Sequence, residues 1–238
     1  MLAMSGIPDK TIGFQGLRAC RLFAGVEDVP LAVLAQSMRS RRYRDGETIF
    51  HQDDPGDALY VVAEGAVMIV LQPAEDGEPA ILATLGAGEF FGTLALLDDA
   101  PRSATAVALG KAQTLSLHRD AFLALIDEDR TLRRALLASL AREIRLITEH
   151  VHDLHFLDLP GRLVRRILRE ADGRSRNASG SATVPWPYTQ AELAGMIGGS
   201  RQTVNRLLSD LVSAGLIRLE RDVLVIPDPL ALERSIRR

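Results

Sequence analysis

Residues 189–214 constrain the fold of this chain more than any other stretch. Two helical patterns are separated there by a pair of glycines. The first pattern opens with Thr189 and Glu192, whose hydroxyl and carboxylate can satisfy two backbone N–H groups reciprocally in a capping box. Gly198-Gly199 supplies the positive φ that a sharp turn needs, and Ser200 is a good N-cap for the next helix. The stretch therefore predicts a helix-turn-helix.

The second helix of this motif has two different sides. Apolar residues recur at intervals that place them on one face, which predicts a stripe made of Val204, Leu207, Leu208, Leu211 and Val212. A surface helix with no function would show the same periodicity. The capped helix, the tight turn and the arginines on the other side together favour DNA binding. The residues expected to contact DNA are Thr189, Ser200, Arg201, Gln202, Asn205 and Arg206.

A hairpin pattern follows this motif. After Gly215, two β-rich runs at 216–220 and 223–226 flank the polar pair Arg221-Asp222. A hairpin in this position predicts a winged helix-turn-helix.

Length and charge indicate a second, different domain. At 238 residues the chain can bury two ordinary cores. Residues from 160 onward carry 13 Arg and Lys against 8 Asp and Glu, whereas the earlier residues carry 15 against 23. A basic segment after an acidic one fits a DNA-binding half and a half that does not bind DNA. There is no apolar run of about 18 residues and no signal-peptide pattern in residues 1–10, so we expect a cytoplasmic protein without membrane contact.

Residues 42–117 read as an all-β domain. Short β-rich runs alternate with turn signals such as Glu64-Gly65 and Gly110-Lys111, which predicts a sandwich or jelly roll. The expected strands are 48–50, 59–62, 66–71, 81–85, 105–109 and 114–117. A roll of this kind can enclose one small ligand.

One segment of that domain suggests an anion site. Gly92 allows a close backbone approach, Thr93 and Leu94 can begin a short helix, and Arg102 and Ser103 follow. Helix N-termini and a bidentate guanidinium are two common ways of holding a phosphate. The alternative is that Arg102 forms a surface ion pair with Asp98 or Asp99.

The β domain, the helix after it and the winged helix-turn-helix together resemble the cAMP receptor protein/FNR (Crp/Fnr) superfamily of bacterial transcription regulators. Residues 43–50 and 55–60 are similar to the family's opening strands, 91–105 to its phosphate-binding cassette, and 156–158 to its inter-domain hinge. The resemblance implies an α+β fold with an N-terminal β jelly-roll (cyclic-nucleotide-binding-like) domain at 1–128, a dimerisation helix and hinge at 129–158, and a C-terminal winged helix-turn-helix domain at 159–238. It also implies that Arg102 and Ser103 hold the phosphate and that Arg201, Gln202 and Arg206 read bases.

Two positions depart from the pattern of the cyclic-AMP-binding members. Those members carry a glutamate after the glycine, where this chain has Thr93, and two adjacent hydroxyl residues on the long helix, where it has Ile147 and Thr148. The phosphate half of the pocket is retained, so the effector residues implied are Gly92, Thr93, Leu94, Arg102, Ser103 and Thr148. The implied effector is a small anion, a cyclic nucleotide being the expected class, with cAMP itself bound weakly.

The helix predicted at 132–154 carries a seam of its own. Its apolar residues step by 3, 4, 3, 4 and 3 positions, as in a two-stranded coiled coil. The expected dimer interface is Leu137, Leu140, Ile144, Ile147, Val151 and Leu154. A homodimer would place two recognition helices about 34 Å apart, as a palindromic operator in double-stranded DNA requires. RNA polymerase is a further expected partner.

The sequence gives weaker support for a functional role of the remaining candidate residues. His150, His152 and His155 could share a metal or haem, but no carboxylate or thiolate set completes such a site, and solvated histidines are the alternative. The single cysteine, Cys20, is expected to be a small core residue and excludes a thiolate cluster from one chain. No catalytic constellation is present, so we expect no enzyme and no metal. Two alternatives stay open: the same fold without a small effector, or a nucleotide-binding module that contacts protein.

Overall fold

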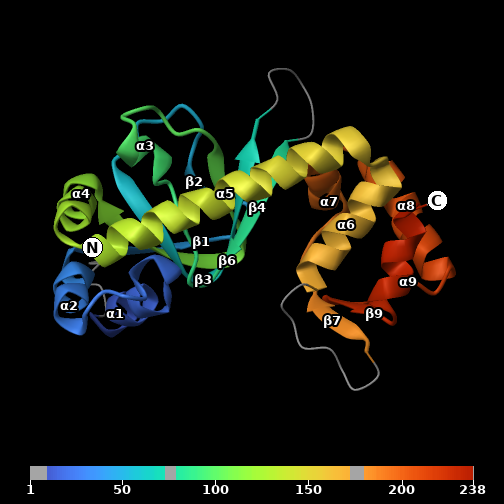
Figure 1. The fold of residues 1–238 in the computed structure, drawn as a ribbon, viewed down its shortest axis with the longest axis horizontal. Coiled ribbons are helices and arrows are strands. Elements are labelled where there is room, and N and C mark those ends of the chain that lie inside the picture. Colours follow the sequence, from blue (N-terminus) through green and yellow to red (C-terminus); the bar gives the residue numbers. More distant parts are fainter. Residues whose placement is uncertain (1–9, 73–78, 172–179, 238) are drawn as a thin grey trace, which may run out of the picture. The chain divides into compact units, whose positions relative to one another are not determined.

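The structure, a computed structural model, describes residues 10–72, 79–171 and 180–237. The chain divides into two compact units, one made of residues 1–74 and 81–145 and the other of residues 75–80 and 146–238. The division falls inside helix α5 (Arg130–Phe156), one continuous helix in Figure 1. The boundaries 1–128, 129–158 and 159–238 stay a prediction. Residues 1–9, which the expectation about a signal peptide concerns, lie outside the described part.

The first unit opens with helices that the sequence patterns did not predict. They are α1 (Lys10–Ala19), the 3-10 turn η1 (Arg21–Phe23) and α2 (Asp28–Ser37). Together with α4 (Arg119–Glu128) they enclose a core that contains Leu31, Phe122 and the fully buried Cys20. Cys20 is therefore a core residue, and burial raises the pKa of its thiol to about 11.

The rest of the first unit is a β roll. Its strands are β1 (Arg39–Tyr43), β2 (Thr48–Phe50), β3 (Ala58–Leu71), β4 (Ala80–Gly86), β5 (Phe90–Phe91) and β6 (Thr105–His118). The sheet order is β1-β6-β3-β4, with β2 paired to β6 and β5 to β3. Helix α3 (Leu94–Leu97) is the short helix expected after Gly92. The roll architecture predicted from the turn signals is confirmed.

Turns were predicted at two positions where the structure has continuous strands. Strands β3 and β6 run straight through Glu64-Gly65 and Gly110-Lys111 and pair from Ala58 with His118 to Val70 with Thr105. The register shifts on both sides of Glu64, so Gly65 lies in a bulge. Its φ is 76°, and a Cβ there would lie 2.1 Å from the Lys111 carbonyl oxygen, which explains why glycine is present in the middle of a strand.

The second unit is the expected winged helix-turn-helix. It contains α6 (Leu159–Ala171), β7 (Ala182–Pro185), α7 (Gln190–Ile197), α8 (Arg201–Ser213), β8 (Arg218–Glu220), β9 (Val223–Ile226), α9 (Pro229–Arg234) and the 3-10 turn η2 (Ser235–Arg237). The small sheet has the order β7-β9-β8, and its first strand was not predicted. None of the helices in the described ranges combines the length and apolarity that a membrane span needs.

Candidate effector and DNA sites

Arg102 is buried at the centre of the candidate effector site, with only 3% of its surface exposed. Its Nη1 donates to the Gly92 carbonyl oxygen at 2.7 Å, and its Nη2 donates to the Ala58 carbonyl oxygen at 2.8 Å. The nearest carboxylate oxygen is Oδ1 of the exposed Asp57, 3.8 Å from Nη2. The guanidinium is thus held by two neutral backbone acceptors, and its one carboxylate neighbour is too distant for a hydrogen bond.

Aromatic rings complete the surroundings of this guanidinium. Its carbon lies 4.3 Å from the Phe50 ring centre and 5.6 Å from that of Tyr60. Tyr60 in turn stacks on Phe91 at 5.2 Å. Burial lowers the pKa of Arg102, and its Nε is a buried donor for which the described residues supply no acceptor. Cation–π contacts offset part of this desolvation.

The surface alternative for Arg102 is wrong. In the described residues neither Asp98 nor Asp99 pairs with it. The Asp99 carboxylate binds Arg119, and the Asp98 carboxylate accepts from the Ala100 N–H. The residues that do surround Arg102 include Phe50 and Asp57, which the sequence patterns did not single out for this site. Asp57 belongs to the motif 55–60, which resembles the family's opening strands. That resemblance was the sequence feature from which its place in the site could have been predicted.

The other expected effector residues, except Thr148, belong to the first unit, and Gly92 contacts Arg102 directly. Gly92 has a φ of 80°, and a Cβ there would lie 2.7 Å from Nη1 of Arg102, so a side chain would displace the guanidinium. Thr93 is buried at the start of α3, whereas Leu94 and Ser103 are exposed. Thr148 belongs to the second unit, and its part in the site stays a prediction.

The helix-turn-helix has the local geometry that its sequence predicts. The Thr189 hydroxyl accepts from the Glu192 N–H at 3.2 Å, and the Glu192 carboxylate accepts from the Thr189 N–H at 2.6 Å. Gly198 ends α7 with a φ of 70°, and the Ser200 hydroxyl accepts from the Thr203 N–H. The capping box, turn and second cap are confirmed, so both hydroxyls already have structural roles.

Helix α8 exposes the residues expected to read bases. Arg201, Gln202, Asn205 and Arg206 are all exposed. The Asn205 side-chain oxygen accepts from the Gln190 amide at 3.0 Å, which ties α8 to α7. On the other face Val204 and Leu208 are buried, whereas Val212 is 41% exposed and so departs from the expected stripe. A pocket of about 300 Å³ lies beside this face, lined by Pro160, Leu163, Leu207, Asp210, Leu211 and Ala214.

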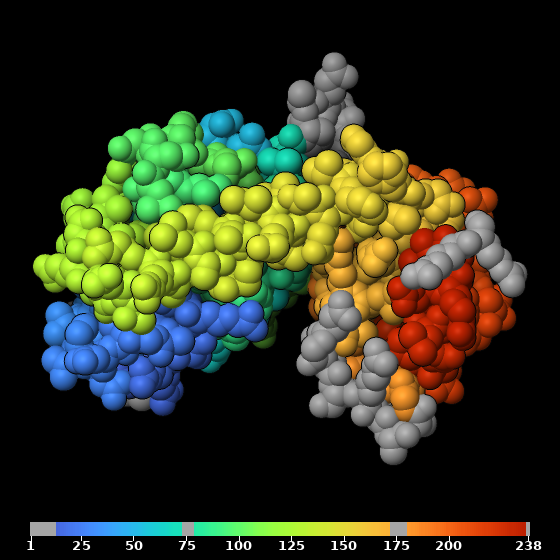
Figure 2. All heavy atoms as spheres, in the orientation of Figure 1, coloured from blue at the N-terminus to red at the C-terminus, as the bar shows by residue number. Residues whose placement is uncertain are grey.

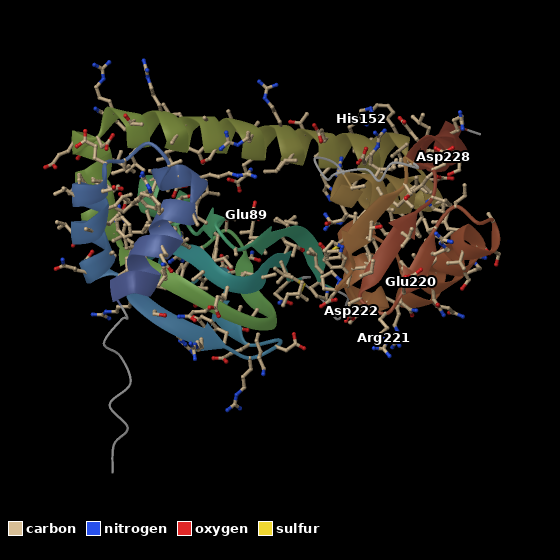
Figure 3. The ribbon with its side chains drawn as sticks, turned by 90° about the horizontal axis from the view of Figure 1, so that it is seen from below. Glu89, His152, Glu220, Arg221, Asp222 and Asp228 are labelled. Carbon is tan, nitrogen blue, oxygen red and sulfur yellow. The ribbon has the colours of Figure 1, made fainter. Side chains whose placement is uncertain are left out.

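The wing is the β8–β9 hairpin. Figure 3 shows Glu220, Arg221 and Asp222 at its tip. Arg221 has a positive φ of 50°, as a tight turn between two strands requires. The Asp222 carbonyl oxygen accepts from the Trp186 N–H at 2.7 Å, which fastens the turn to the segment after β7.

The predicted seam lies on the surface of α5. Figure 2 shows this helix uncovered along the visible face of the molecule. Five of the six seam residues are exposed in the single chain, by 38% to 65% of their surface. They are Leu137, Ile144, Ile147, Val151 and Leu154. Leu140 instead packs against the core of the first unit. A row of exposed aliphatic side chains at this spacing is typical of a helix that lacks its partner.

The histidines near the end of α5, His150, His152 and His155, do not form a metal site with other described residues. His152 points away from the ribbon in Figure 3 and packs on the Phe156 ring at 4.8 Å. Partial burial and the nearby Arg169 lower the pKa of His150. Within the described ranges no group of three His, Cys, Asp or Glu residues could hold a metal ion.

Comparison with known proteins agrees with this geometry. Residues 40–129 match the family model of the cyclic nucleotide-binding domain, and residues 161–235 match that of the Crp-like helix-turn-helix domain. The chain is 34% identical over 216 residues to the CRP-like cAMP-activated global transcriptional regulator of Mycobacterium tuberculosis, covering 91% of this chain and 96% of the relative. It is also 34% identical to the cyclic AMP receptor protein of Thermus thermophilus, covering 91% and 97%.

A solved structure gives the same result. A transcriptional regulator of the CRP family from Thermus thermophilus superposes with a TM-score of 0.66 at 27% identity, covering 83% of this chain and 97% of that one. The two matched domains, their order along the chain and the similarity over nearly its whole length therefore all point to one family. The chain belongs to the Crp/Fnr superfamily, whose members are DNA-binding transcription regulators with a cyclic nucleotide-binding domain, and not enzymes.

Proposed function

We propose that the protein is a homodimer that reads a palindromic operator in the cytoplasm with the exposed face of α8. The observation that carries this proposal is the exposure of Arg201, Gln202 and Arg206 on a helix whose opposite face is buried. A helix fixed in this way can present side chains to the major groove without rearrangement. The exposed seam of α5 supports the homodimer.

Each residue of this face has a proposed part in reading the operator. Arg201 and Arg206 grip guanine through O6 and N7, and Gln202 contacts adenine. Asn205 uses its side-chain oxygen within the protein, so its amide nitrogen is the group that donates to DNA. Thr189 and Ser200 stand at helix N-termini, where backbone N–H groups and hydroxyls contact phosphates and fix the register.

Selection on random duplexes tests this proposal. The full-length protein should enrich a two-fold symmetric motif with a fixed guanine in each half-site. Binding to that motif should weaken steeply with added salt, because phosphate contacts release counterions. Enrichment of no motif, together with capture of a protein partner through the same face, would favour the protein-interaction alternative.

We also propose that a cyclic nucleotide binds at Arg102. The mycobacterial relative is described as cAMP-activated, and the guanidinium here is buried beside Gly92 and Ser103. An incoming phosphate must compete with the carbonyl oxygens of Gly92 and Ala58 for the guanidinium donors. Thr93 brings no carboxylate to a ribose hydroxyl, and a missing hydrogen bond of this kind costs about 0.5–3 kcal/mol.

Calorimetry with cAMP tests the effector. Binding should be weak, and it should be lost in Arg102→Ala. Binding of equal strength in wild type and Arg102→Ala would place the phosphate elsewhere. No heat with cAMP, cGMP or a cyclic dinucleotide would favour the alternative in which the fold works without a small effector.

RNA polymerase is the proposed further partner, since a transcription regulator must act on it directly or by blocking it. Reconstituted transcription from a promoter that carries the selected operator tests this. Addition of the protein should change the transcript yield from that promoter and leave a promoter without the operator unchanged.

A further inference from the structure

A single side chain joins the ends of two helices in the second unit. Arg162, on the first turn of α6, donates from Nη2 to the Leu154 carbonyl oxygen at 3.0 Å and from Nε to the Leu157 carbonyl oxygen at 3.1 Å. Leu154 lies in the last turn of α5, and Leu157 directly follows the last residue of that helix. Its Nη1 donates to the carbonyl oxygen of Ile197, the last residue of α7, at 3.1 Å. Arg162 thus uses all three of its side-chain nitrogen atoms at the ends of two helices.

The chemistry of helix ends makes this contact specific to arginine. The last carbonyl groups of a helix have no intrahelical donor and carry partial negative charge, so a cation with several N–H groups satisfies them well. A guanidinium offers five donors in a fixed plane, whereas an ammonium is a compact point charge on a flexible stem. A lysine at this position keeps the charge but cannot span two helix ends in the same geometry.

The helix end held by Arg162 leads directly into the recognition helix. Gly198 and Gly199 connect Ile197 to α8, and a Cβ on Gly198 would lie 3.4 Å from Nη1 of Arg162. A Cβ on Gly199 would lie 2.9 Å from the Leu159 side chain. The turn of the helix-turn-helix therefore packs on the first residues of α6, at the point where Arg162 binds.

The opposite end of α7 is fastened to the same helix by a different arginine. Arg166 donates to the Tyr188 hydroxyl at 3.0 Å and pairs with Glu170, and the Tyr188 hydroxyl donates to Glu170 at 2.8 Å. Tyr188 immediately precedes the N-cap of α7. Arg162 and Arg166 are four residues apart on α6 and hold the two ends of α7. Of these two arginines, Arg162 is the one that also contacts backbone carbonyls at the end of α5 in the described part of the chain.

We propose that Arg162 is a positioning residue that sets the orientation of α8 relative to the end of α5. Through its shared guanidinium, a shift of the α5 C-terminus is passed to the α7 C-terminus and on through the Gly198-Gly199 turn. The proposal rests on the proposed function, because its consequence is measured as base reading. Arg162 touches no base itself and acts through the placement of Arg201 and Arg206.

The test compares Arg162→Lys with the matched control Arg166→Lys in the full-length protein. Both variants keep the charge and lie on the same face of α6. Arg162→Lys should lower the ratio of operator affinity to non-specific DNA affinity by roughly tenfold, a common size for coupling between sites. Phosphate contacts, which dominate non-specific binding, should be unchanged. A purely structural role would lower the thermal midpoint and leave the affinity ratio of the folded protein as it was, which would overturn the proposal.

Amide hydrogen exchange gives a second readout that does not need DNA. Arg162→Lys should speed exchange in both 154–158 and 197–200, whereas Arg166→Lys should leave 154–158 unchanged. Faster exchange at only one of the two ends in Arg162→Lys would refute the two-ended role. If that variant does not fold, amide exchange in the wild type tests the proposal instead. Segments 154–158 and 197–200 should then open with the same free energy, and different values would overturn the proposal. Failure of wild type to select an operator would refute the proposed function and leave this exchange test intact.

Discussion

Replacing Ile144 by alanine should weaken the proposed dimer. Ile144 is 64% exposed in the single chain. Complete burial of an isoleucine side chain contributes about 1.5–3 kcal/mol, so covering the exposed two-thirds contributes about 1–2 kcal/mol in each chain. Two-fold symmetry repeats the loss in the partner, which gives about 2–4 kcal/mol per dimer. At 1.4 kcal/mol per decade, the dimer dissociation constant should rise about 30- to 700-fold.

Leu146→Ala is the matched control. Leu146 is 60% exposed and lies two residues further along α5, but it falls outside the 3-4 stepping of the seam. A coiled coil predicts that Ile144→Ala shifts the monomer–dimer equilibrium and that Leu146→Ala leaves it near the wild-type value. Sedimentation equilibrium over a range of concentrations measures both. Equal weakening by the two variants would mean a broad apolar contact, and no change with Ile144→Ala would refute the seam.

Three further predictions follow from named contacts. Arg206→Ala should cost about 1–3 kcal/mol on the selected operator and relax preference at one base pair, which a binding series on single-base operator variants checks. Thr189→Ala should remove the capping box of α7 and lower the free energy of unfolding by about 1 kcal/mol in urea titrations, and an unchanged value would contradict the cap. Burial raises the pKa of Cys20 from 9.0 to about 11, so the folded state holds this proton more tightly than the unfolded state does. The resulting stability is complete below pH 9 and is lost, by about 2–3 kcal/mol, between pH 9 and 11, so the decline that urea titrations find over this range should be smaller by that amount in Cys20→Ala.

The helix-turn-helix could be predicted in detail because its signals are local. The capping box at Thr189, the turn at Gly198 and the cap at Ser200 each depend on atoms within four residues, and all three are present. The 3-4 stepping of α5 is likewise a property of one helix. Patterns of this kind need no knowledge of what the segment packs against.

Features that depend on distant partners were harder to predict. Strand β1 has four exposed residues out of five and shows no apolar alternation, so only its pairing with β6 makes it a strand. Gly65 signals a positive φ, but whether that φ serves a turn or a bulge is decided by the strand opposite. The burial of Arg102 was missed for a related reason: its acceptors are the backbone carbonyls of Gly92 and Ala58, which any residue type would supply.

The central place of β6 in the sheet has a consequence for biosynthesis. Strands β1 and β2 both find their sheet partner in β6, and Arg39 pairs with Ser116, far along the chain. These early strands must wait on the ribosome until residues 105–118 have been made, since ladders between distant segments cannot form before both exist. Helix α5 is translated after β6. We therefore expect each nascent chain to close its own roll before its seam is complete, so that subunits meet as folded domains and β1 is paired before it can associate with another chain.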